Sequence, residues 1–134
     1  MGGDYAPLEN VLGAIMAANS VDAEILLVGD SVEIKKILKD EGYNGNKISV
    51  VHTSEVITNE DKPTTSIRKK KDSSMVKCFE LLANGEVDAM ISAGSTGALL
   101  AGSIHYLKRI EGISRPALAP VLPGEDGGVV LIDG

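Results

Sequence analysis

The sequence of 134 residues contains no tryptophan, one phenylalanine and one cysteine. Aromatic residues make up 3% and hydrophobic residues 43%, so any core must be mainly aliphatic. A single cysteine excludes an internal disulfide, and two histidines and one cysteine without ligand spacing indicate no metal site. The 13 basic residues are outnumbered by 19 acidic ones, giving a net charge of −6, which argues against a protein that binds nucleic acid.

Targeting and membrane-spanning segments are also missing from the sequence. No apolar run approaches the roughly 18 residues of a transmembrane helix. The N-terminus carries Asp4 where a signal peptide needs positive charge, and no apolar stretch follows it. We therefore expect a cytoplasmic protein.

Short aliphatic runs alternate with segments of helical periodicity. The runs of strand length are residues 25–28, 48–52, 87–92, 117–121 and 129–132. Helices are predicted after Pro7 (apolar stripe Leu8, Val11, Leu12 and Ile15), after Asp30, after Ser73 or Ser74, and over residues 98–107, packed on a sheet through its small residues. Residues 53–72 are expected to form a long connection with one helical turn. This alternation predicts an α/β fold with a mostly parallel sheet covered by helices on both faces.

Capping signals place the ends of two helices. Asp30 with Glu33 forms a capping box, and Gly42 lies just past the end of the helix that follows. The clearest helix ends at Asn84-Gly85 and has on its apolar face Met75, Cys78, Phe79 and Leu82. Cys78 is therefore interpreted as an inert buried thiol.

A glycine-bearing turn follows the predicted strand 87–92. Ligands of parallel sheets bind at the carboxyl ends of strands, and glycines with the free amides of a helix N-terminus form an anion site. The predicted phosphate-binding residues here are Ser92, Gly94, Ser95, Thr96 and Gly97. The alternative is a tight turn with Ser/Thr capping, and the turn matches neither the Walker A motif nor G-x-G-x-x-G.

Four consecutive cations, residues 68–71, precede a second helix N-terminus. Lys70 with the hydroxyls of Ser73 and Ser74 is predicted to bind the same anion through charge-assisted hydrogen bonds. The alternative is a solvated loop with an ordinary serine cap.

The third candidate segment is Gly2-Gly3-Asp4. If a strand precedes it, these residues lie at the same carboxyl edge, and Gly3 and Asp4 would shape the pocket floor. The alternative is a remnant of cloning. Because no Ser-His-Asp set can be assigned, no catalytic residue and no cofactor are predicted.

Five motifs in order carry a family resemblance: residues 1–7, 54–57 with 61–63, 68–75, 92–98 and 115–123. The chain resembles the bacterial PlsX family, the phosphate acyltransferases of phospholipid synthesis. The resemblance implies transfer of a fatty acyl group from acyl carrier protein to inorganic phosphate. It also implies a three-layer αβα sandwich, similar to isopropylmalate dehydrogenase and phosphate acetyltransferases, in a homodimer. Family members associate peripherally with the cytoplasmic membrane and supply a downstream glycerol-3-phosphate acyltransferase.

The chain departs from the family pattern at three places. The first strand and the C-terminal half of the family are missing, so residues 1–134 are interpreted as the N-terminal part of one larger αβα domain that is inactive alone. Ser95 stands where the family usually has asparagine.

The resulting hypothesis is that phosphate itself is the nucleophile, held by the two anion-binding turns. Arg68, Lys69 and Lys71 would steer the acidic carrier protein toward the site. Two alternatives stay open: a short-chain acyl-CoA:phosphate transferase, and a non-catalytic module that binds phosphate or a partner.

Overall fold

A computed structural model describes residues 2–124 and 127–132 of the chain. Met1, which belongs to the first of the sequence motifs above, lies outside these residues. The elements are α1 (Leu8–Ser20), β1 (Ile25–Gly29), α2 (Ser31–Asp40), β2 (Ile48–His52), α3 (Pro63–Lys69), α4 (Ser74–Ala83), α5 (Thr96–Gly102), the π-helical turn η1 (Ser103–Leu107), β3 (Val121–Gly124) and β4 (Gly127–Val130). In the described part of the chain, every helix is too short or too polar to cross a bilayer.

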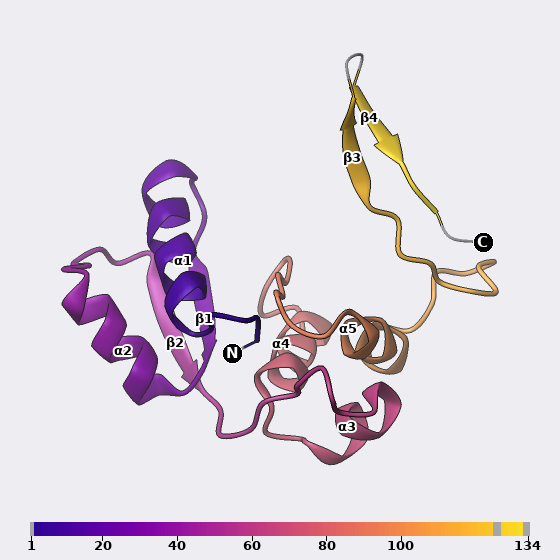
Figure 1. Cartoon of the computed structure of the whole chain (residues 1–134), viewed down its shortest axis with the longest axis horizontal. Coiled ribbons are helices and arrows are strands. Elements are labelled where there is room, and N and C mark those ends of the chain that lie inside the picture. Colours follow the sequence, from indigo (N-terminus) through magenta and orange to yellow (C-terminus); the bar gives the residue numbers. More distant parts are fainter. Residues whose placement is uncertain (1, 125–126, 133–134) are drawn as a thin grey trace.

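The molecule has two groups of elements and a projecting hairpin (Figure 1). Helices α1 and α2 contact each other and both strands of the parallel pair β1–β2, which runs in register from Ile25 opposite Ile48 to Gly29 opposite His52. Helices α3, α4 and α5 form the second group, and α4 contacts β1. The predicted α/β class is therefore confirmed, with a small parallel sheet compatible with an αβα fold.

The core lies where the second group of helices meets. Ile57, Ile67, Met75, Val76, Phe79 and Ala98 form one buried cluster. The Tyr106 ring, from η1, stacks on Phe79 with its centroid 5.8 Å away. The predicted helix over residues 98–107 exists as α5 plus η1, but it packs on α3 and α4 instead of a sheet.

The predicted helix ends are confirmed, with Asp30 as the N-cap of α2. The Asp30 carboxylate accepts hydrogen bonds from the amides of Val32 (2.8 Å) and Glu33 (3.1 Å). Gly42 follows α2 with a φ of +66°, a conformation that glycine adopts without strain. Ser73 caps α4, and Asn84 with Gly85 (φ +71°) ends it.

The predicted apolar stripe of α1 is only partly right. Val11 is buried, but Leu8 is exposed, and the other buried residues are Ala14 and Ala18. Small residues three and seven positions after Val11 form the contact face, because they allow the helix to approach its neighbours closely.

Two predictions for residues 53–92 differ from the structure. The connection 53–72 contains the two-turn helix α3, which Pro63 starts at a position that favours proline. Residues 87–92 form no strand, and Ile91 is 96% exposed. An aliphatic run becomes a strand only where it finds a pairing partner, and the described residues provide none for this run.

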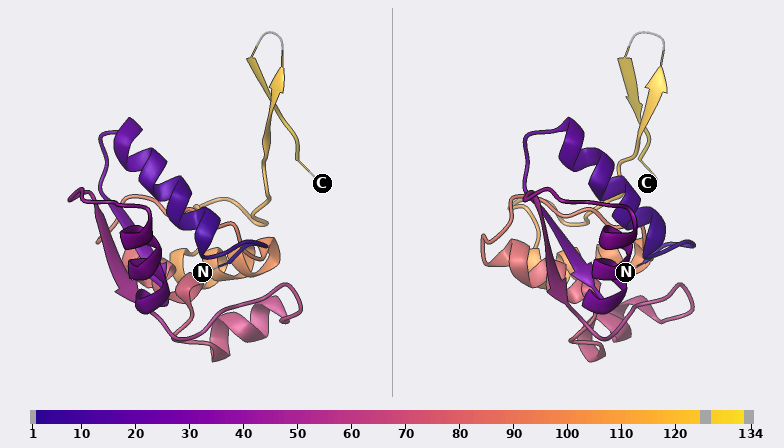
Figure 2. Two further views of the ribbon diagram at one scale, coloured as in Figure 1. Left: turned by 60° about the vertical axis from the view of Figure 1, so that its left-hand side comes forward. Right: turned by 90° about the vertical axis from the view of Figure 1, so that its left-hand side faces the viewer.

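The last two strands form an antiparallel hairpin instead of joining a parallel sheet. Strand β3 is shifted from the predicted 117–121 to Val121–Gly124, and β4 begins at Gly127, two residues before the predicted start at 129. Because two residues separate the strands and a parallel pair needs a long crossover, only antiparallel pairing is possible. The hairpin stands away from the helices in both views of Figure 2.

Candidate functional site

The candidate site is a pocket of about 260 Å³ formed by three segments that are far apart in the sequence. One wall comes from the N-terminal segment, the second from the loop after β2, and the third from the turn before α5. The lining residues are Gly2, Gly3, Asp4, Ala6, Val56, Ile57, Thr58, Asn59, Glu60, Gly94 and Ser95.

Glycines allow two of these walls to touch. A Cβ on Gly3 would lie 3.3 Å from the carbonyl oxygen and the Cβ of Ala93, and Gly3 has a φ of +107°. A Cβ on Gly2 would lie 3.2 Å from the Gly94 Cα. Side chains at these positions would push the two backbones apart, so the glycines set the width of the pocket.

The serine hydroxyls of the turn before α5 are occupied by the backbone. Ser92 Oγ accepts a hydrogen bond from the Gly94 amide at 3.2 Å, and Ser95 Oγ accepts one from the Ala98 amide at 3.4 Å. Thr96 and Gly97 are exposed and lie off the pocket lining, with Gly97 against Pro63. Of the residues predicted in this turn, Gly94 and Ser95 face the pocket.

The cationic segment lies behind the pocket. Lys70 Nζ donates to Asp61 Oδ2 (2.6 Å) and to the Val56 carbonyl (2.8 Å). Ser73 is fully buried, and its hydroxyl donates to the Lys70 carbonyl (2.7 Å). Ser74 is buried, and its amide donates to the Glu55 carbonyl (3.3 Å). None of these three predicted phosphate ligands is among the described residues that line the pocket.

The other three cations of this segment are exposed. Lys71 Nζ donates to the Tyr106 hydroxyl at 3.2 Å and lies 5.6 Å from the centre of that ring. Arg68 and Lys69 are in the last turn of α3 with exposed side chains. They are therefore accessible to a macromolecular partner rather than to a ligand in the pocket.

Two carboxylates that bind the connection after β2 are held in their charged form. The Lys70 ammonium, and after it the Thr58 amide, lower the pKa of Asp61 through hydrogen bonds. The Ser54 hydroxyl and amide do the same to the pKa of Asp72. The lining itself contains the carboxylates of Asp4 and Glu60, which can accept hydrogen bonds from a phosphate that carries a proton.

Comparison with known proteins assigns the chain to a family. The model of a family described as "Fatty acid synthesis protein" matches residues 1–134. The chain belongs to this family. The resemblance based on the five motifs is thereby confirmed.

Curated relatives with the name phosphate acyltransferase match nearly the whole chain. Those from Thermoanaerobacterium thermosaccharolyticum and Alkaliphilus oremlandii are 51% and 52% identical over 133 residues, 99% of this chain. The relative from Clostridioides difficile is 46% identical over 132 residues. The chain spans about two fifths of the length of these relatives (39%, 40% and 39%).

The wall at residues 56–60 is the part of this family member's site that sequence reasoning missed. Residues 54–57 and 61–63 contributed to the family resemblance, but no site role was attached to the loop between them. The signal that points to it is the length of the connection 53–72, because long loops within compact domains are often functional.

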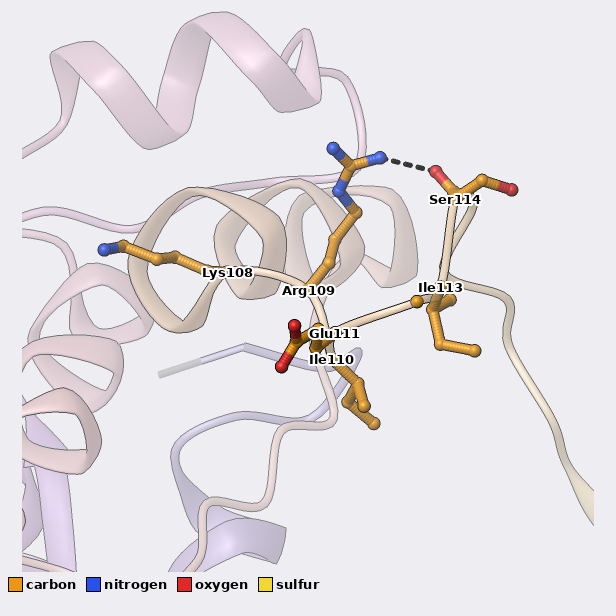
Figure 3. Close-up of a pocket in the computed structure, with 7 residues that line it drawn as sticks. Lys108, Arg109, Ile110, Glu111, Ile113 and Ser114 are labelled. Atoms are coloured by element: carbon orange, nitrogen blue, oxygen red, sulfur yellow. Dashed lines mark hydrogen bonds between the residues drawn. The ribbon is translucent and has the colours of Figure 1, made fainter.

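A larger hollow, of about 570 Å³, lies in the loop of residues 108–114 (Figure 3). All the residues that line it are consecutive, and Arg109 closes the loop by donating to the Ser114 carbonyl. It contains no predicted site residue and no contribution from another element, so we assign it no function.

The residues with nucleophilic or ligating side chains lie elsewhere. Burial raises the pKa of the Cys78 thiol, which makes it a poor nucleophile. His52 Nδ1 accepts a hydrogen bond from the Ser31 amide at 3.2 Å. The described ranges 2–124 and 127–132 contain no group of three or more His, Cys, Asp or Glu residues arranged to hold a metal ion.

Proposed function

We propose that the protein transfers a fatty acyl group from acyl carrier protein to inorganic phosphate, giving an acyl phosphate for phospholipid synthesis. The observation that carries this proposal is the pocket in which Gly3 and Gly94 come together from two of the family motifs. The relatives that are 51% and 52% identical to this chain over 133 residues are named phosphate acyltransferases.

The reaction needs positioning rather than a protein nucleophile. A phosphate oxygen attacks the thioester carbonyl carbon, the carbon–sulfur bond breaks, and the carrier thiolate takes up the proton that phosphate loses. Holding both reactants in one pocket replaces a bimolecular encounter. Backbone amides that line the pocket, other than the Gly94 amide that donates to Ser92 Oγ, would stabilise the negative charge that develops on the carbonyl oxygen.

The size of the pocket limits what it holds. A volume of about 260 Å³ is close to the lower end of ligand pockets, roughly 300 Å³. It accommodates phosphate and the thioester group but no long acyl chain. We propose that the acyl chain is bound by the part of the domain beyond this chain.

The exposed cations Arg68, Lys69 and Lys71 are proposed to guide the acidic carrier protein to the pocket. Steering by charge raises the association rate and weakens with salt. The apparent KM for the carrier protein should therefore rise with ionic strength more steeply in the wild type than in a variant with these three residues replaced by alanine.

The remaining proposals follow from family membership. In the complete protein the described elements would form the N-terminal part of one three-layer αβα sandwich. We propose that this domain works as a homodimer, associated peripherally with the cytoplasmic membrane, and delivers acyl phosphate to a glycerol-3-phosphate acyltransferase.

An assay of the full-length protein tests the proposed reaction. The expected result is release of thiol from long-chain acyl carrier protein that depends on added phosphate. Activity on short-chain acyl-CoA alone would instead identify a short-chain acyl-CoA:phosphate transferase. Phosphate binding without thiol release from either substrate would identify a non-catalytic module.

A further inference from the structure

The Lys70 ammonium contacts the pocket wall from behind and is held by two oxygen atoms. It lies 2.6 Å from Asp61 Oδ2 and 2.8 Å from the Val56 carbonyl oxygen. Both side chains of the ion pair are largely shielded, with 31% and 24% of their surfaces exposed. A cation paired at this distance exerts little net field on a third charge, because the carboxylate cancels it.

Asp61 also binds the loop that forms the pocket wall. The carboxylate oxygen that binds Lys70 also accepts hydrogen bonds from the Thr58 amide (2.8 Å) and the Thr58 hydroxyl (3.3 Å). One ammonium group therefore fixes the loop at both ends, at the Val56 carbonyl and at the turn from Thr58 to Asp61.

The loop held in this way is one complete wall of the pocket. Residues 56–60 all line it, while neither Lys70 nor Asp61 does. The wall faces Gly2–Asp4 and Gly94 from the other two segments. Moving the loop changes the width of the pocket without changing any of its lining groups.

The backbone of Lys70 is itself anchored to two helices. Its amide donates to the Ser66 carbonyl in α3 (2.8 Å), and its carbonyl accepts a hydrogen bond from the Ser73 hydroxyl (2.7 Å). The same Ser73 oxygen accepts the Val76 amide and thereby caps α4. Lys70 thus joins the loop to α3 and to the N-terminus of α4.

We propose that Lys70 is a positioning residue: through its ion pair with Asp61 it holds residues 56–60 as the wall of the phosphate pocket, and it does not contact phosphate. The expected effect on the KM for phosphate rests on the proposed function. The structural consequence, the order of the loop, is independent of any activity.

The kinetic test uses Lys70→Met, Asp61→Asn and the double variant in the full-length protein, with Lys36→Met on the exposed face of α2 as the control. We expect each single variant to raise the KM for phosphate about tenfold, with a smaller change in kcat. The effect of the double variant should be clearly less than the product of the two single effects, because the ion pair is shared, although Lys70 also binds the Val56 carbonyl and Asp61 also binds Thr58. Lys70→Arg, which keeps the charge, should recover part of the loss.

A direct phosphate ligand would behave differently. Asp61→Asn would then release the Lys70 ammonium, and the KM for phosphate would stay unchanged or fall. That result, or additive effects in the double variant, would overturn the proposal.

The structural test is hydrogen exchange of residues 56–61. The Thr58 amide should exchange at least about tenfold faster in both single variants than in the wild type and the Lys36→Met control. Unchanged exchange in both would refute the positioning role. If the wild type shows no acyl transfer, the proposed function fails, but accelerated exchange would still support the role of Lys70 in holding the loop.

Discussion

Gly102 lies directly against the ring of Phe79. A Cβ at position 102 would be 2.1 Å from Cε2 of this ring, closer than any real contact allows. Phe79 is in the centre of the buried cluster of α3, α4 and α5, and it also stacks on Tyr106. The absence of a side chain at Gly102 is therefore what allows α5 to pack on α4.

Gly102→Ala is expected to lower the free energy of unfolding by about 1–3 kcal/mol, because either the ring or the helix must move. Urea denaturation of the full-length protein measures this change. Gly13→Ala is the control, since a Cβ at Gly13 in α1 has open space around it and alanine is favoured over glycine within a helix. Equal stability of Gly102→Ala and wild type would contradict the packing described here.

Gly3→Ala should weaken phosphate binding as well as stability. The backbone strain at a φ of +107° costs roughly 1–3 kcal/mol, and the new Cβ would separate the segment from Ala93 and widen the pocket. Gly112→Ala is a matched control, because its φ is +83° but a Cβ there meets no atom within 4 Å. The control should lose stability and keep its KM for phosphate; a raised KM in both variants would indicate a general effect of strain.

Asp72 should make stability depend on acid pH. The Ser54 hydroxyl and amide lower its pKa in the folded state, so its contribution is present at neutral pH and is lost as the pH falls through that lowered value, below about pH 4. Wild type and Asp72→Asn should therefore differ in urea midpoint near pH 6, and the difference should shrink as the pH falls below about 4. Ser54→Ala removes the hydroxyl hydrogen bond that lowers the pKa of Asp72 most, so it should show part of the same dependence of stability on pH. A difference that is constant with pH would exclude this linkage.

Thr53 offers a route to a more stable protein. Its side chain is 1% exposed, and its hydroxyl has no hydrogen-bond partner among the described residues. Thr53→Val replaces the hydroxyl by a methyl group of similar size and should leave stability unchanged or raise it by about 1 kcal/mol. Thr53→Ser keeps the hydroxyl but loses a methyl group, so it should be less stable than wild type. A destabilised Thr53→Val would show that the hydroxyl has a partner.

Cys78 should react slowly with alkylating reagents in the native protein. Burial raises the pKa of its thiol, and the reactive species is the thiolate. We expect iodoacetamide at pH 7.5 to label it at least about tenfold more slowly than free cysteine, with the rate recovering in urea. Mass spectrometry of samples taken over time measures both rates. Rapid labelling of the native protein would mean that the thiol is accessible and ionised.

Sequence reasoning succeeded where structure is determined by a few adjacent residues. The caps at Asp30 and Ser73 and the glycines that end α2 and α4 are interactions between near neighbours, so their pattern is visible in the sequence. Residues 87–92 failed as a strand for the opposite reason. Their aliphatic character says that they can pair, but pairing depends on a partner elsewhere in the fold.

The difference between contacts of near neighbours and contacts of distant residues also applies to the site. Gly3 and the turn at Gly94 were expected at one carboxyl edge of a sheet; the structure brings them together, although residues 87–92 form no strand that could provide this edge. Lys70 was predicted as a phosphate ligand because it follows other cations. Its ion pair with Asp61, nine residues earlier, is a tertiary contact that a run of basic residues does not reveal.

The connection after β2 begins and ends at almost the same point. Glu55 pairs with Ser73 as an isolated parallel bridge, and the Ser74 amide donates to the Glu55 carbonyl. Residues inserted near Asn59 would therefore lengthen this connection without separating β2 from α4. Each doubling of the length of a flexible loop costs only about 0.6 kcal/mol in closure entropy. Insertions and deletions near Asn59 should consequently reshape the wall at residues 56–60 while β2 and α4 keep their relative positions.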